Sequence, residues 1–146
     1  MDEGINALDL NIYVEKLYQM WIKHKNIRIL VDYDDTIKPY NTASEYLCKV
    51  VINTLIEAKK LGATIVLWTC RSGTRLNEAL KYCESIGLEF TEVNPTTPFL
   101  PEQSTKAYGN ILLDDKAGLE QALTTLQFTI DKYKKFVYET NKKQRL

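Results

Sequence analysis

The chain has 146 residues, and its 19 Lys and Arg balance its 19 Asp and Glu. This length suits one domain, and the even charge gives no indication of a nucleic-acid or membrane-surface partner. The cysteines, Cys48, Cys70 and Cys83, are odd in number and lack CxxC spacing, which favours reduced thiols in a cytoplasmic protein without a zinc motif. No apolar run approaches the roughly 20 residues that span a bilayer.

The first predicted element is an amphipathic helix from about Ala7 to His24, with apolar residues at three- and four-residue spacing. We expect it to pack on the domain as a helical extension over residues 1–26, so that residues 1–146 form a single domain. His24 is the only histidine. This count excludes catalytic triads that need histidine and metal sites that need several.

The first predicted strand is the apolar run Ile29 to Val31, and carboxylates follow it at Asp32, Asp34 and Asp35. Such a run is typical of a buried strand in a parallel sheet, where ligands bind at the carboxyl ends. Residues two apart point to the same side, so we expect Asp32 and Asp34 to project together. Because close carboxylates repel each other, this pair calls for a metal ion, a basic partner or both.

Thr42 and Glu45 have the spacing of a capping box and predict a helix that ends near Leu61. The second strand, Ala63 to Trp68, is followed by a hydroxyl, small residues and an arginine. These residues are Thr69, Cys70, Arg71, Ser72 and Gly73. Backbone N–H groups can converge at such a strand end, so the segment is a candidate phosphate cradle.

The second half of the chain repeats this alternation. A helix over about 74–86 and a strand over 88–93 precede a proline-containing loop at 94–105 and then Lys106. The fourth strand, Ile111 to Leu113, ends in the acidic pair Asp114 and Asp115, and a helix is expected from about Lys116 to Tyr138. The pattern predicts an α/β fold, a three-layer α/β/α sandwich around a parallel, Rossmann-like sheet.

These strand ends, in this order, resemble the four motifs of the haloacid dehalogenase (HAD) superfamily of phosphohydrolases. The first motif is an apolar strand followed by D-x-D-x-T, matched by Asp32, Asp34 and Thr36. The second is a strand ending in Thr or Ser, matched by Thr69. An EF-hand fits the same acidic run poorly, because its loop glycine and bidentate glutamate are replaced here.

The third motif of the family is a lysine with no fixed spacing, best matched by Lys106, with Lys116 as a rival. The fourth is an acidic pair after a strand, matched by Asp114 and Asp115. The segments LWTCR and ILLDDKAG further look like small stand-alone family members from bacteria and phages. The resemblance covers essentially the whole chain from Ile27 onward.

The resemblance implies a phosphatase that acts through an aspartyl-phosphate on Asp32, with Asp34 as general acid and base. It implies that Thr69 and neighbouring groups hold the phosphoryl oxygens and that a lysine offsets the negative charge of the nucleophile and the phosphate. The candidate phosphate-binding residues are Thr69, Cys70, Arg71 and Lys106. The implied cofactor is Mg²⁺. Its implied protein ligands are Asp32, the backbone carbonyl of Asp34, and Asp114, with Asp115 hydrogen-bonded outside the coordination sphere.

The intervals between the motifs are too short for a cap domain, so the site is expected to be open to a small phosphorylated molecule or a phosphorylated nucleic-acid end. The run Asp114-Asp115-Lys116 also resembles polynucleotide 3′-phosphatases, in which arginine is usual after the acidic pair. A non-catalytic phosphate-binding or interaction module of the same fold is a third alternative. A receiver domain keeps its acidic pair on the first strand and its phosphoacceptor on a middle strand, whereas here a second acidic pair lies on the last strand. The sequence does not define an oligomeric state.

Overall fold

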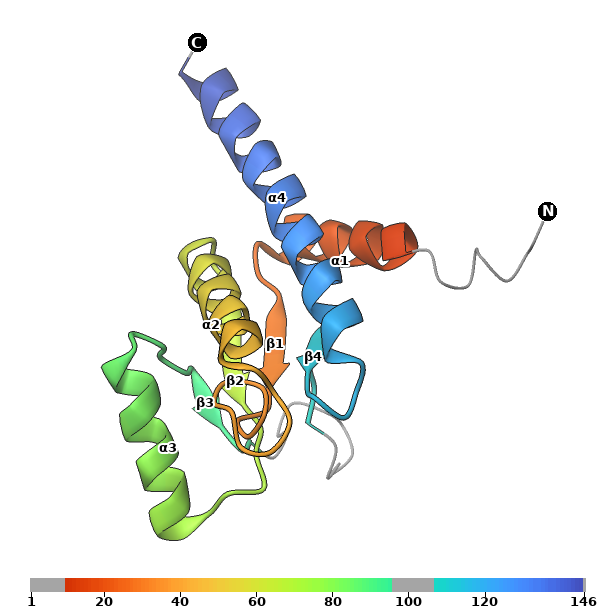
Figure 1. Cartoon of the computed structure of the whole chain (residues 1–146). Coiled ribbons are helices and arrows are strands. Elements are labelled where there is room, and N and C mark those ends of the chain that lie inside the picture. Colours follow the sequence, from red (N-terminus) through yellow and green to blue (C-terminus); the bar gives the residue numbers. More distant parts are fainter. Residues whose placement is uncertain (1–9, 96–106, 146) are drawn as a thin grey trace, which may run out of the picture.

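The computed structural model describes residues 10–95 and 107–145. Helices and strands alternate along most of this chain (Figure 1). The elements are α1 (Leu10–His24), β1 (Arg28–Val31), α2 (Glu45–Lys60), β2 (Thr64–Leu67), α3 (Gly73–Ser85), β3 (Glu92–Val93), β4 (Ile111–Leu113) and α4 (Leu119–Gln144). None of the helices in these described ranges is long and apolar enough to cross a bilayer.

The four strands form one parallel sheet in the order β3-β2-β1-β4. Val31 at the end of β1 is in register with Leu67 on one side and Leu113 on the other. The ladders continue for one more bond, from Asp32 N–H to the Leu113 carbonyl at 2.9 Å and from Trp68 N–H to the Val31 carbonyl at 2.9 Å. The carboxyl ends of β1, β2 and β4 therefore meet at one level, and the predicted parallel α/β fold is confirmed.

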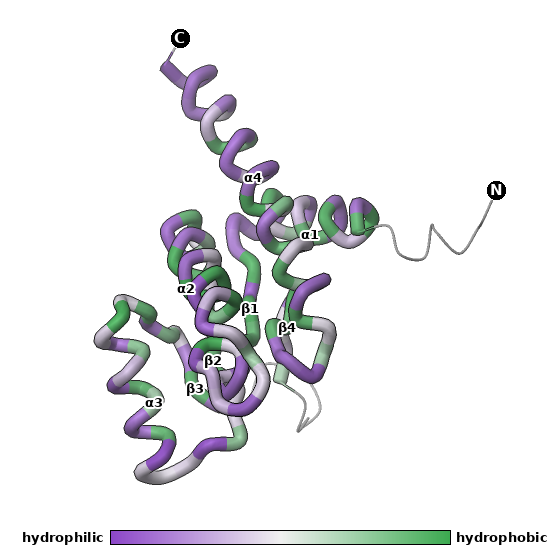
Figure 2. The backbone as a smooth tube through the Cα atoms, in the orientation of Figure 1, coloured by the Kyte–Doolittle hydropathy of each residue, from purple (hydrophilic) through white to green (hydrophobic). Residues whose placement is uncertain are grey.

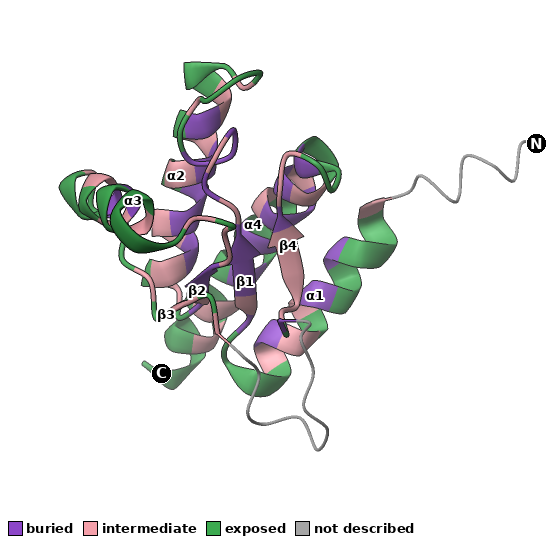
Figure 3. Cartoon of the chain, turned by 90° about the horizontal axis from the view of Figure 1, so that it is seen from below, coloured by how far each residue is buried: buried purple, intermediate pink, exposed green. Residues whose placement is uncertain are grey.

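The two inner strands, β1 and β2, bury residues on both of their faces. Ile29 and Val31 belong to a large core that also receives side chains from all four helices, whereas Leu30 belongs to a smaller cluster with Val66 and Ala107. The central position of β1 and its buried colouring are visible in Figure 3. Burial on two faces explains why these strands are continuous apolar runs and do not alternate with polar residues.

The first helix, α1, packs against α4. Trp21 is fully buried and stacks on Tyr133, with ring centroids 4.4 Å apart and an interplanar angle of 14°. Tyr18 meets Phe136 edge to face one turn away. Beyond this contact the last turns of α4 project from the body of the molecule and are mostly hydrophilic (Figure 2).

Three predicted boundaries were wrong. Helix α2 is capped by Ser44, whose hydroxyl accepts the Leu47 N–H at 3.1 Å, and not by Thr42, whose N–H binds Asp35 instead. Strand β3 contains two residues, not the six of 88–93, because sheet pairing begins only with the bond from Thr91 N–H to the Ile65 carbonyl. Helix α4 begins three residues later than expected, after a left-handed Gly118, and extends to Gln144.

Candidate functional site

Three carboxylates meet where β1 and β4 end. Asp32 follows β1, and Asp114 and Asp115 follow the neighbouring β4. Each offers one carboxylate oxygen, and these oxygens all lie within 4.8 Å of one another. The meeting follows from topology, because β4 pairs with β1 in a register that brings Asp32 level with Asp114. Asp115, expected to lie outside the coordination sphere, is a full member of this acidic cluster.

The acidic cluster retains protons when no cation is bound. Burial, together with the negative charges of Asp114 and Asp115, raises the pKa of Asp32 to about 7. Burial and Asp114 also raise the pKa of Asp115. A cation that entered the cluster would replace these protons, and the carboxylates would then be ionised at neutral pH.

This raised pKa predicts how the stability of the metal-free protein depends on pH. An unfolded Asp titrates near pH 4, so the folded state holds an extra proton on Asp32 between about pH 4 and pH 7. Its stabilising contribution is complete below the unfolded pKa and is lost as pH rises through about 7. We expect the melting temperature in EDTA to fall between pH 5 and pH 8, and the fall to be smaller in Asp32→Asn. Equal pH slopes for the two proteins would contradict this.

The acidic cluster is braced by the turn after β1. The fully buried hydroxyl of Thr36 accepts the Asp115 N–H at 3.2 Å, and the Asp114 carboxylate accepts the Lys116 N–H at 2.9 Å. Thr36 is thus a fixed support for the acidic pair on β4. This contact gives the threonine of D-x-D-x-T a physical role that spacing alone does not reveal.

Asp34 makes a different set of contacts. Its carboxylate binds Arg71 in a bidentate pair, with Nη2 2.7 Å from Oδ1 and Nε 3.0 Å from Oδ2. The guanidinium also lies 4.7 Å from the centre of the Tyr33 ring. Asp32 and Asp34, expected to project together, have different surroundings: Asp34 binds a basic side chain, and Asp32 lies in the acidic cluster.

The turn after β2 is held by Asn94, a residue that sequence reasoning missed. Its Oδ1 accepts the Thr69 N–H at 2.7 Å, and its own N–H binds the Leu67 carbonyl at 2.7 Å. The Thr69 hydroxyl in turn accepts the Arg71 N–H at 3.2 Å, whereas Cys70 is exposed. The sequence signal that could have identified Asn94 is its position, because it directly follows β3 at the same edge of the sheet.

Two lysines, Lys106 and Lys116, are candidates for the third motif. Lys106 lies outside the described residues, and Lys116 is exposed beside the acidic cluster. Among the described residues, Arg71 is a cation in direct contact with a motif carboxylate.

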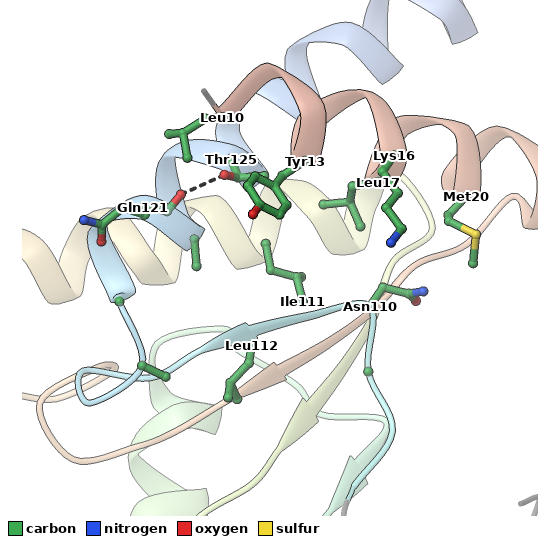
Figure 4. A pocket seen from close by; sticks show the side chains of 14 residues that line it. Leu10, Tyr13, Lys16, Leu17, Met20, Asn110, Ile111, Leu112, Gln121 and Thr125 are labelled. Carbon is green, nitrogen blue, oxygen red and sulfur yellow. Dashed lines mark hydrogen bonds between the residues drawn. The ribbon is translucent and has the colours of Figure 1, made fainter. Parts of the chain in front are cut away.

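Two cavities lie on either side of the loop between β4 and α4. A pocket of about 720 Å³ between α1, β4 and α4 is lined mainly by apolar side chains (Figure 4). A smaller cavity of about 310 Å³ is bordered by Asp35, Thr42 and Asp115. The larger pocket contains none of the clustered carboxylates, so we identify the strand ends and the smaller cavity as the candidate functional site.

Comparison with solved structures finds a similar chain, described as a conserved protein from Bacteroides thetaiotaomicron. The two share 28% sequence identity and superpose with a TM-score of 0.53, over 62% of this chain and 77% of the other. No protein-family model and no curated protein matches the chain. The likeness supports the α/β fold and names no activity.

Proposed function

We propose that this chain is a Mg²⁺-dependent phosphomonoester hydrolase of the HAD superfamily, without a cap domain and active in the cytoplasm. The observation that carries the proposal is the acidic cluster, in which a carboxylate at the end of the central strand faces an acidic pair from its neighbour. Thr69 and Arg71 at the end of the adjacent β2 add the hydroxyl and the cation that a phosphoryl group requires.

The acidic cluster fits Mg²⁺ in donor type and in size. Mg²⁺ prefers oxygen ligands in an octahedron at about 2.1 Å, where adjacent oxygens are about 3.0 Å apart and opposite oxygens about 4.2 Å. The carboxylate oxygens lie within 4.8 Å of one another and would move closer together around the ion. Asp32, Asp114 and Asp115 would hold the ion, which would supply charge neutralisation for the cluster and for the bound phosphate.

In the proposed reaction, an oxygen of Asp32 attacks phosphorus and the ester oxygen leaves, taking a proton from Asp34. Asp34 then removes a proton from the water that cleaves the aspartyl-phosphate, so phosphate is released and Asp32 is restored. Before the first step Asp34 must exchange its pairing with Arg71 for a proton. The substrate phosphate offers Arg71 an alternative bidentate partner, which makes this exchange part of substrate binding.

Within the described residues, the segments between the motifs are too short for a cap domain over the site. One loop, α2 and β2 separate Thr36 from Thr69, and α3 with β3 follows the second motif. This arrangement favours a phosphate carried on the end of a larger molecule, such as a nucleic-acid end, or a small phosphorylated compound.

The test is phosphate release from an aryl phosphate, a nucleotide panel and 3′- and 5′-phosphorylated oligonucleotides, each with Mg²⁺ and with EDTA. Mg²⁺-dependent release that is absent in Asp32→Asn would support the proposal, and the best substrate would identify the class. Equal, negligible release by both proteins from every substrate would contradict hydrolysis of these classes and favour a binding module.

Replacing Arg71 is expected to reduce turnover. Hydrogen bonds to charged groups are worth about 1.5–3 kcal/mol, which corresponds to roughly 10- to 150-fold in kcat/KM. We expect a loss in this range for Arg71→Ala and a smaller loss for Arg71→Lys, which keeps the charge without the bidentate geometry. Arg75→Ala is the matched control, because Arg75 is exposed and contributes to Arg71 only its backbone carbonyl. Unchanged kcat/KM in Arg71→Ala would show that the pair has no part in turnover.

A further inference from the structure

Asp35, between Asp34 and Thr36, has no role in the reaction proposed above, yet it makes the densest set of contacts near the site. Its side chain is buried, and its Oδ1 accepts backbone N–H groups from four consecutive residues. These are Tyr40 at 2.7 Å, Asn41 at 2.9 Å, Thr42 at 3.1 Å and Ala43 at 3.1 Å. The turn at 40–43 is therefore fastened to the end of β1 by one carboxylate.

The backbone of Asp35 is itself unusual, because its φ angle of 58° lies in the left-handed region. Glycine adopts this conformation without strain, and Asp tolerates it better than most residues. A residue needed only for the turn could be glycine, whereas Asp also supplies an anion to four N–H dipoles. Helix α2 begins two residues after these donors, so its N-terminus adds to the positive potential around the carboxylate.

The turn at 40–43 is connected to the candidate site through the two chain neighbours of Asp35. Asp34 precedes it and pairs with Arg71, while Thr36 follows it and accepts the Asp115 N–H. The N–H of Asp35 also binds the Lys38 carbonyl at 2.8 Å, which closes the tight turn between them. A shift of Asp35 would therefore displace both the carboxylate that meets Arg71 and the hydroxyl that supports the acidic cluster.

We propose that Asp35 is a positioning residue: by holding the 40–43 turn, its carboxylate fixes Asp34 and Thr36 and thereby sets the metal affinity of the acidic cluster and the rate of turnover. The inference rests on the proposed function for its effect on rate. Its effects on the turn and on Mg²⁺ binding do not require that a substrate be known.

Two substitutions separate the roles of backbone and carboxylate. Asp35→Gly keeps the left-handed conformation and removes the acceptor, whereas Asp35→Asn keeps an acceptor oxygen and also tolerates that conformation. Asp131→Asn, at an exposed position of α4, controls for the loss of one negative charge. Far-UV circular dichroism and a melting curve establish that each variant is folded before comparison.

The primary readouts are amide hydrogen exchange at 40–43 and the Mg²⁺ affinity measured by titration calorimetry with the metal alone. In Asp35→Gly we expect faster exchange at these amides and Mg²⁺ affinity weakened by roughly 10- to 100-fold, as for other groups that support metal ligands. With an active substrate in hand, kcat should fall by a similar factor. Asp35→Asn should lose less than Asp35→Gly, because its side chain keeps an acceptor oxygen and loses only the charge.

Each outcome decides a separate point. Wild-type exchange and Mg²⁺ affinity in Asp35→Gly would overturn the proposal, and so would faster exchange with unchanged affinity, because the turn would then be independent of the cluster. A wild-type protein that binds no Mg²⁺ would overturn the coupling to metal. A wild-type protein that binds Mg²⁺ and hydrolyses nothing would instead contradict the proposed function, while exchange and affinity would still report on Asp35.

Discussion

Asp32→Asn is expected to fold normally and to lose phosphate release by at least about a thousandfold, because an amide cannot act as the nucleophile. The substitution is nearly isosteric, and it removes a carboxylate whose burial raises its pKa to about 7. The variant should therefore melt no lower than wild type in EDTA at pH 8. Loss of activity combined with retained or increased stability would distinguish a functional carboxylate from a structural one.

The measurement is single-turnover and steady-state phosphate release at saturating Mg²⁺, with circular dichroism and melting temperature on the same samples. Asp131→Asn, an exposed position on α4, is the matched control for removal of one charge and should retain wild-type rates. Turnover in Asp32→Asn within tenfold of wild type would remove Asp32 from the role of nucleophile, whatever its effect on stability.

Asp114→Asn is expected to be more stable than wild type in EDTA and less stable than wild type at saturating Mg²⁺. Wild type should gain stability from Mg²⁺ at 100 times Kd by about 2.7 kcal/mol, or roughly 5 to 10 °C for a domain of this size. In the variant most of this gain should be lost, because one of three clustered ligands is neutral. Without metal, the variant should be the more stable protein, because Asp114 repels both Asp32 and Asp115.

Thermal melts of both proteins in EDTA and over a Mg²⁺ series at pH 8 test this prediction. The curves of melting temperature against Mg²⁺ concentration for the two proteins must cross. A general effect of ionic strength does not produce such a crossing, and matched concentrations of NaCl provide the control. Parallel curves, with Asp114→Asn below wild type at every concentration, would show that this carboxylate supports the fold and does not bind a cation.

The sequence was sufficient for the arrangement of the sheet and for the edge at which the candidate site lies. Apolar runs at β1 and β4 have no other stable place than a buried parallel sheet, and their acidic ends follow from that placement. Thr36 lies in the turn after β1, and Asp114 directly follows β4, as the sequence predicts.

What the sequence could not provide is the pairing of side chains across different turns. Asp34 and Arg71 are 37 residues apart, and their ion pair depends on the conformation of the turn after β2. That conformation is held in turn by Asn94. The N-cap of α2 was predicted wrongly for the same reason. The Thr42 N–H binds the Asp35 carboxylate, and the spacing of residues around Thr42 does not reveal this contact.

The stacking of Trp21 on Tyr133 has a consequence for how the chain acquires its fold during synthesis. Helix α1 leaves the ribosome well before α4, which carries the aromatic surface on which α1 packs. The acidic cluster is likewise incomplete until β4 has emerged and paired with β1. A nascent chain therefore exposes the apolar side of α1 until α4 has been made, and its acidic cluster forms only after β4 has emerged.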